Sequence, residues 1–194
     1  MSDARSQRRR ERVQLMGMAI DRLREHEAIE TIVGAASHRH GGWVITPNLD
    51  QLRRFVNEPQ LRDLFGRADL VLVDGTTLVW ASHILGTPLP ERVPGSTLTL
   101  ALSAAAAETK LSLFLLGGNP GTARRAAERL TERFPKLSVV GSLCPPLGFE
   151  QSPTELARIE AELTRAHPHL VYVCLGFPKQ EYLIARLRQH FPDT

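Results

Sequence analysis

Short apolar runs and longer amphipathic stretches alternate along this chain. Each run has the length of a strand and is followed closely by Gly, Pro, Asn or Asp. Because the runs are apolar nearly throughout, they predict strands that are buried on both faces, as in a parallel sheet. The predicted strands are Val13–Met16, Trp43–Ile45, Leu70–Val73, Leu111–Leu116, Leu137–Val140 and Leu170–Leu175.

The stretches after the last three runs repeat apolar residues at the spacing of a helix. Asn119 and Pro120 predict the N-cap and the first turn of the first of these helices. Alternating strands and helices predict an α/β fold of the Rossmann-like type, a doubly wound, mostly parallel sheet with flanking helices. The apolar helix faces are Ala123, Ala126, Ala127, Leu130 and Phe134; Leu156, Ile159, Leu163 and Ala166; and Leu183, Ile184, Leu187 and Phe191.

Length and composition indicate one globular domain. The chain has 194 residues, of which 42% are apolar and 23% charged, and no linker or repeat interrupts it. Its net charge of +3 is mild, and we expect no nucleic-acid partner. We expect residues 1–12 to be a basic, solvated tail, with contact to an anionic membrane surface as the alternative. Residues 13–194 then form a single domain.

Cysteine usage and hydropathy indicate the compartment. Cys144 and Cys174 are the only cysteines and have no spacing typical of a zinc site, so we expect two reduced thiols in the core. The sequence contains no apolar run of about 20 residues and no signal peptide. These features predict a cytoplasmic protein.

Four polar or glycine-rich segments follow predicted strands. They are residues 46–48, 74–76, 117–121 and 176–181. In an open parallel sheet, ligands bind beyond the carboxyl ends of the strands. We therefore expect the four segments to lie on the same edge of the sheet.

Asp74 is the candidate catalytic residue. It closes an apolar strand, and a carboxylate there can act as general base towards an acceptor hydroxyl. The alternative is that Asp74 caps the helix that starts near Thr76, although Thr76 or Thr77 could make that cap equally well.

Further polar residues are candidate substrate contacts. Thr46 and Asn48 can hydrogen-bond sugar hydroxyls or an amide, although Thr-Pro-Asn is also typical of a helix start. Arg92, in the loop that ends at Gly95, can hold a phosphate or carboxylate, or can be a surface arginine.

The remaining two segments have features of an anion site. Gly117, Gly118, Asn119 and Gly121 let the backbone approach a phosphate at a helix N-terminus, or form a plain strand–helix turn. Lys179 follows Pro178 at a helix start, where a cation opposes the helix dipole unless it meets an anion. Because no Asp-x-Asp pair is present, we expect no metal and no other cofactor, with leaving-group charge met by cations and helix N-termini.

The ordered set of motifs resembles the WecG/TagA/CpsF glycosyltransferase family from about Val13 to the end of the chain. The matching segments are Thr46-Pro47-Asn48, Asp74-Gly75, Arg92-Val93-Pro94-Gly95, Gly117-Gly118-Asn119-Pro120-Gly121 and Gly176-Phe177-Pro178-Lys179-Gln180-Glu181. Thr97 departs from the pattern, because the family often has an acidic residue there. The family's last strand and its arginine-rich C-terminal segment, linked with membrane association and closure of the active site, have no counterpart here. We therefore expect a domain that lacks its C-terminal segment.

The resemblance implies an inverting, metal-independent transferase. Its donor would be a UDP-sugar, often an N-acetylmannosamine derivative, and its acceptor a polyprenyl-diphosphate-linked sugar in cell-surface polysaccharide or teichoic acid synthesis. The resemblance implies a location at the inner face of the plasma membrane, with peripheral membrane contact of the full-length protein. A homo-oligomer is compatible with the resemblance. The alternatives are a non-catalytic UDP-sugar-binding module and a nicotinamide oxidoreductase, although the glycine fingerprint of the latter is absent.

The resemblance also assigns roles to individual residues. Asp74 would be the general base. The substrate contacts would be Thr46, Asn48, Arg92 and Gly95. The nucleotide-sugar site would consist of Gly117, Gly118, Asn119, Gly121, Gly176, Lys179, Gln180 and Glu181.

Overall fold

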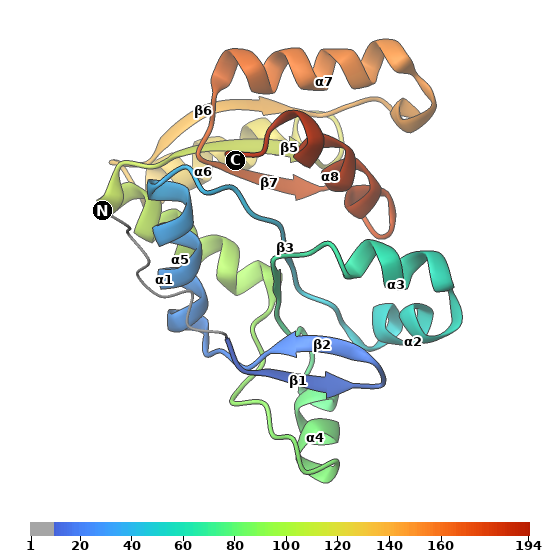
Figure 1. The fold of residues 1–194 in the computed structure, drawn as a ribbon. Coiled ribbons are helices and arrows are strands. Elements are labelled where there is room, and N and C mark those ends of the chain that lie inside the picture. The colour runs from blue at the N-terminus through green and yellow to red at the C-terminus, as the bar shows by residue number, and fades with distance from the viewer. Residues whose placement is uncertain (1–9) are drawn as a thin grey trace, which may run out of the picture. The chain divides into compact units, whose positions relative to one another are not determined.

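The computed structural model describes residues 10–194, which form two compact units (Figure 1). Unit 1 contains the described residues up to Ala28 together with Val44–Gly95. Unit 2 contains Ile29–Trp43 and Ser96–Thr194. Each unit has its own strands and its own buried residues. Within the predicted N-terminal tail, Arg5, Arg8 and Arg9 lie outside the described residues.

Unit 1 begins with an antiparallel hairpin of β1 (Arg12–Leu15) and β2 (Met18–Asp21), in which Leu15 pairs with Met18. The connecting residues Met16 and Gly17 have φ values of 50° and 85°. Positive φ at both central residues is the backbone geometry that matches the twist of a two-residue hairpin. β2 is absent from the sequence prediction because Met-Gly is not among the usual signals for such a turn.

A parallel pair of short strands forms the other half of unit 1. Buried Asp21 joins this pair to the hairpin, since its carboxylate accepts the Val71 N–H at 2.9 Å and pairs with Arg12 Nε at 2.9 Å. The elements of this half are β3 (Val44–Ile45), β4 (Leu70–Val71), α2 (Leu49–Asn57), α3 (Pro59–Phe65) and α4 (Thr76–Ile84).

Unit 2 contains a parallel sheet with the strand order β6-β5-β7. Helices α1 (Glu25–Ser37) and α5 (Gly95–Thr109) precede its strands along the chain, and most of each belongs to this unit. Its other elements are β5 (Ser112–Gly117), α6 (Thr122–Arg133), β6 (Ser138–Leu143), the 3-10 turn η1 (Phe149–Gln151), α7 (Pro153–Ala166), β7 (Leu170–Cys174) and α8 (Lys179–His190).

The central strand β5 organises the core of unit 2. Leu113 and Leu115 face one side of the sheet, where they join buried residues of α1, α5 and α6. Phe114 and Leu116 face the other side, where they join buried residues of η1, α7 and α8. Side chains alternate along a strand, so a nearly continuous apolar run serves both faces. The three layers confirm the predicted Rossmann-like α/β fold, and every predicted strand is present with small shifts at its ends. The described strands form three separate sheets, so the expectation that the four polar segments share one sheet edge is wrong.

Two local predictions are wrong. Helix α6 begins at Thr122 and has Gly121 as its N-cap, so Asn119 and Pro120 lie in the turn before it. The Thr122 N–H donates to the Asn119 carbonyl oxygen at 2.9 Å, which closes that turn. Cys144 and Cys174 are both free thiols, as expected, but neither belongs to the core, because they lie at the carboxyl ends of β6 and β7.

None of the helices in residues 10–194 has the length and apolar character needed to cross a membrane.

Candidate active site

The predicted site residues fall into two groups, one in each unit. Thr46, Asn48, Asp74, Arg92 and Gly95 belong to unit 1. The glycine-rich loop after β5 and the segment after β7 belong to unit 2.

Backbone contacts bring the unit 1 segments together. The Asp74 N–H donates to the Pro47 carbonyl oxygen at 2.9 Å, which places the loop after β4 beside the loop after β3. The Val93 N–H donates to the Val73 carbonyl oxygen at 2.7 Å, which adds the segment before α5. A Cβ on Gly95 would lie 3.0 Å from Thr46 Oγ1. Three segments that are far apart in sequence are therefore neighbours.

The Asp74 side chain does not cap α4. The N-cap of that helix is Gly75, and no side chain makes the cap hydrogen bond. Thr76 and Thr77 are the first residues of the helix, so they do not cap it either. Within residues 10–194, the half-buried Asp74 carboxylate has no hydrogen-bond or ion-pair partner. The capping alternative is therefore wrong, and both carboxylate oxygens can accept a proton from a substrate.

Asn48 has a structural task. Its Oδ1 accepts the Gln51 N–H at 3.0 Å, and Gln51 Oε1 accepts the Asn48 N–H at 2.9 Å, which makes a reciprocal cap on α2. The helix-start interpretation of Thr-Pro-Asn is thus confirmed for Asn48. Its amide nitrogen has no partner in the described part of the chain, so it can still donate to a ligand. Arg92 is exposed and likewise has no partner there.

The glycine-rich loop of unit 2 is tied to the strand ends on both sides of β5. Gly117 has φ +117°, and a Cβ there would lie 2.3 Å from the Cys174 carbonyl oxygen, so only glycine fits beside β7. The Gly118 N–H donates to that carbonyl at 2.7 Å. On the β6 side, Cys144 Sγ donates to the Gly118 carbonyl oxygen at 2.9 Å. These contacts preorganise the loop before any ligand binds.

The loop leads directly into an uncapped helix N-terminus. Asn119 is exposed, and Gly121 takes φ +78° at the N-cap of α6 without a side-chain cap. The first N–H groups of such a helix lack intrahelical acceptors and carry the positive end of its dipole. This helix start is compatible with a bound phosphate, which stays a prediction.

Lys179 opens α8 and already has an anionic partner. Its Nζ lies 3.2 Å from Glu150 Oε1 and 5.8 Å from the centre of the Phe149 ring. A backbone hydrogen bond within its own residue lowers the pKa of Glu150, and Lys179 lowers it further. Sequence reasoning missed Glu150, because nothing near it in the chain marks it as a partner. Since both side chains are partly exposed, the pair contributes little to stability.

Glu181 is the buried carboxylate of this group. Its side chain is 3% exposed, Gln180 Nε2 donates to its Oε1 at 3.0 Å, and its Oε2 has no hydrogen-bond partner in the described structure. Burial raises the pKa of Glu181. Gly176 precedes this segment, and its carbonyl oxygen accepts the Gln180 N–H at 3.0 Å. A buried carboxyl group with a shifted pKa is a common feature of ligand sites.

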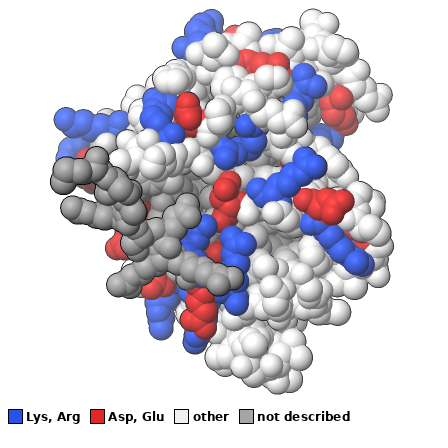
Figure 2. All heavy atoms as spheres, viewed as in Figure 1, with Lys and Arg blue, Asp and Glu red and all other residues white. Residues whose placement is uncertain are grey.

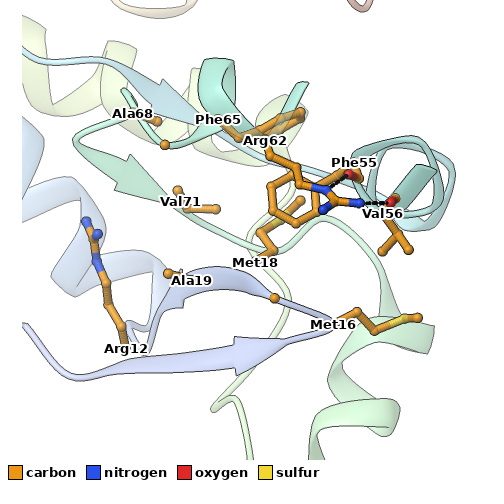
Figure 3. A pocket seen from close by; sticks show the side chains of 12 residues that line it. Arg12, Met16, Met18, Ala19, Phe55, Val56, Arg62, Phe65, Ala68 and Val71 are labelled. Atoms are coloured by element: carbon orange, nitrogen blue, oxygen red, sulfur yellow. Dashed lines mark hydrogen bonds between the residues drawn. The ribbon is translucent and has the colours of Figure 1, made fainter. Parts of the chain in front are cut away.

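A pocket of about 430 Å³ lies elsewhere in unit 1 (Figure 3). The hairpin and the region of α2 and α3 line it, with Met18, Phe55 and Phe65 among its apolar walls. Arg62 bridges one side by donating to the carbonyl oxygens of Phe55 and Val56 (Figure 3). None of the predicted site residues lines this pocket. Among residues 10–194, no three His, Cys, Asp or Glu side chains gather as a metal site.

Comparison with known proteins identifies relatives along nearly the whole chain. Three of them are named N-acetylglucosaminyldiphosphoundecaprenol N-acetyl-beta-D-mannosaminyltransferase. The protein of Bacillus spizizenii (strain ATCC 23059 / NRRL B-14472 / W23) is 28% identical over 79% of this chain and 58% of its own length. That of Bacillus subtilis (strain 168) is 25% identical over 90% of this chain and 63% of its own. That of Staphylococcus aureus (strain NCTC 8325 / PS 47) is 26% identical over 94% and 70%.

The aligned region thus spans about three fifths to two thirds of the length of these curated relatives. A family model described as "Glycosyl transferase WecG/TagA/CpsF family" matches residues 13–194. The match covers both units and every predicted site residue. The chain therefore belongs to the WecG/TagA/CpsF family of glycosyl transferases.

Proposed function

We propose that this chain carries the catalytic region of an inverting glycosyltransferase. The enzyme moves a sugar, an N-acetylmannosamine derivative, from a UDP-sugar to a polyprenyl-diphosphate-linked acceptor. The names of the relatives support the sugar and the acceptor. The single observation that carries the proposal is the Asp74 carboxylate, which has no partner in the described residues. It lies in the family-matched region, and the Asp74 backbone N–H donates to Pro47, the residue after Thr46.

The chemical step is a direct displacement at the anomeric carbon. Asp74 takes the proton from the acceptor hydroxyl as the new bond from that oxygen to the anomeric carbon forms. The bond from the anomeric carbon to the UDP oxygen breaks, and UDP leaves with the bonding electron pair. The transition state has oxocarbenium character, as in glycoside hydrolysis. Thr46, Asn48, Arg92 and Gly95 position the reacting substrates around Asp74.

Unit 2 supplies the donor site in this proposal. The diphosphate rests against Gly117, Gly118 and the N-terminus of α6, where backbone N–H groups favour an anion. Lys179 exchanges Glu150 for the diphosphate and stabilises the negative charge that develops on the leaving UDP. Glu181, with one unpartnered oxygen, and Gln180 hold hydroxyl or amide groups of the nucleotide sugar. Asn119, Gly121 and Gly176 complete this site.

A transfer assay tests the proposal. The chain is incubated with UDP-N-acetylmannosamine and a short-tailed, soluble N-acetylglucosaminyl-diphosphate lipid analogue, in the presence of EDTA. We expect a disaccharide product and stoichiometric UDP. Binding of the UDP-sugar without any product would instead support the non-catalytic binding module. A strict requirement for Mg²⁺ or Mn²⁺ would contradict the metal-independent mechanism.

A further inference from the structure

The C-terminal part of α4 presents an exposed apolar surface. Trp80 is 66% exposed, Ile84 87% and Leu85 59%, which is unusual for three large apolar side chains so close in sequence. Trp80 and Ile84 are four residues apart and share one helix face, while Leu78 and Ser82 on the opposite face are buried. We name the surface formed by Trp80, Ile84 and Leu85 the α4 tip.

The region around the α4 tip contains no formal charge. From Gly75 to Pro90 the sequence has no Asp, Glu, Lys or Arg, whereas 23% of the whole chain is charged. Figure 2 shows the consequence, since the projection at the bottom of the view, where α4 lies in Figure 1, is free of blue and red. A surface that exposes large apolar side chains and carries no charged residue is suited to a non-aqueous environment.

The tip is held in place by ordered structure. Ser82 Oγ donates to the Val79 carbonyl oxygen at 2.6 Å and accepts the Leu89 N–H at 2.9 Å. The Thr87 N–H donates to the Ser82 carbonyl oxygen at 2.9 Å, and Leu89 is fully buried. The segment after α4 is thus folded back onto the helix. The apolar side chains are displayed by a rigid support.

We propose that the α4 tip inserts into the surface of a lipid bilayer. Tryptophan prefers the membrane–water interface, and an apolar helix face buries itself at the boundary between head groups and acyl chains. The inference rests on the proposed function in one respect, because a polyprenyl-linked acceptor is anchored in a bilayer that the enzyme must approach.

The position of the tip along α4 suits such an acceptor. The helix starts two residues after Asp74 and has nine residues, so it is roughly 13 Å long at about 1.5 Å per residue. The base and the inserted tip are therefore at opposite ends of one short helix. In this arrangement, the sugar and diphosphate of the acceptor extend along α4 from the bilayer to Asp74.

The chain carries a spectroscopic reporter for the test. It has two tryptophans, of which Trp43 is buried, so a lipid-borne quencher reaches only Trp80. The protein is mixed with phosphatidylcholine and phosphatidylglycerol vesicles that contain doxyl-labelled lipid, in 0.5 M NaCl and without nucleotide or acceptor. We expect a blue shift and quenching of the Trp80 emission. Unchanged emission at this salt concentration would overturn the proposal.

Variants locate the contact. In an Ile84→Gln, Leu85→Gln double variant, we expect the vesicle partition coefficient to fall on the order of 10-fold per removed apolar side chain. Leu147→Gln is the matched control, since Leu147 is 98% exposed in unit 2, and it should partition like the unchanged protein. Equal losses in both variants would overturn the assignment. Melting temperatures check that each variant is folded.

Two further outcomes separate this proposal from its rivals. If the chain self-associates in sedimentation without lipid and the double variant does not, the α4 tip is an interface between copies and the proposal is wrong. If Trp80 inserts but no sugar is transferred, only the proposed function fails. If sugar is transferred to the soluble acceptor while Trp80 stays in water on vesicles, only the membrane inference fails.

Discussion

The predicted site residues of the two units differ in whether their side chains already have hydrogen-bond or ion-pair partners. In unit 1, the carboxylate of Asp74 and the guanidinium of Arg92 have no partners in the described residues, although the surrounding backbone is fixed by hydrogen bonds from Asp74 and Val93. In unit 2, three predicted residues already have partners, whereas the Glu181 Oε2 atom has none in the described residues. Gly118 is bound on two sides, Lys179 pairs with Glu150, and Gln180 donates to Glu181.

The difference matches two kinds of task. A general base must keep its lone pairs available for a proton that arrives with the substrate. A site for a charged nucleotide works best when its donors are oriented beforehand, because no reorganisation is then needed as charge develops. Under the proposed function, unit 1 carries the general base and unit 2 carries the nucleotide contacts.

The largest expected effect is on catalysis in unit 1. Asp74→Asn keeps the shape of the side chain but removes its basicity, so we expect turnover to fall on the order of 10²- to 10⁴-fold. The affinity for UDP should remain unchanged, because the nucleotide binds in unit 2. The exposed Asp63 on α3 is the control, and Asp63→Asn should have normal kcat. Parallel losses of UDP affinity and turnover would show that Asp74 supports the fold instead.

The next largest effect is a loss of folding stability when glycines of the loop after β5 are replaced. Gly117→Ala introduces a Cβ 2.3 Å from the Cys174 carbonyl oxygen at φ +117°, so β7 must shift. We expect a loss of about 3 kcal/mol in the free energy of unfolding, from backbone strain and overpacking together. Gly121→Ala meets only the flexible Arg125 side chain and should lose about 1 to 2 kcal/mol. Chemical denaturation measures both, and equal losses would refute the close approach of β7.

A smaller effect concerns the exchange of anions at Lys179. Removing its charge in Lys179→Met should weaken UDP binding about 10-fold, the usual value of one charge-assisted hydrogen bond. Glu150→Gln removes the competing partner, so UDP should bind as tightly as before or more tightly. Isothermal titration calorimetry compares the two variants. Weaker binding in Glu150→Gln would mean that the ion pair supports the site.

The smallest effect is the pH dependence caused by Glu181. Burial raises the pKa of Glu181 above its ordinary value of 4.5, so the folded state holds the proton more strongly than the unfolded state. The stability that this proton contributes is complete below pH 4.5 and is lost as the pH rises through the folded pKa. Glutamine at position 181 cannot ionise. The melting temperature of Glu181→Gln minus that of the unchanged protein should therefore increase from pH 4 to pH 8. Exposed Glu132→Gln should show no such trend.

The sequence predicted those features that depend on local pattern. Apolar runs located six strands, although only the central ones, such as β5, are buried on both faces, and alternate residues of β1 and β6 are exposed. The glycines of the loop after β5 predicted a phosphate site or a tight strand–helix turn. The turn is present, closed by the Thr122 N–H on the Asn119 carbonyl oxygen, and the phosphate site stays a prediction. The order of motifs indicated the family.

Features that depend on distant contacts could not be read from the sequence. The partner of Lys179 comes from η1, and Gly141 is required because a Cβ there would lie 2.4 Å from the Phe114 ring. The sequence could not exclude Asp74 as the N-cap of α4, a position that the structure gives to Gly75. The hairpin turn at Met16 and Gly17 was missed because Met at its first central position, with a φ of 50°, is not a residue type typical of such turns.

Hydrogen exchange with and without UDP tests the division between the two units most directly. The exchange of backbone amides is measured by mass spectrometry in EDTA-containing buffer. We predict that saturating UDP slows exchange in peptides that cover residues 117–123 and 176–182 of unit 2, and leaves residues 70–95 of unit 1 unchanged. Protection confined to residues 70–95, or protection that appears only when a divalent metal is added, would contradict the account.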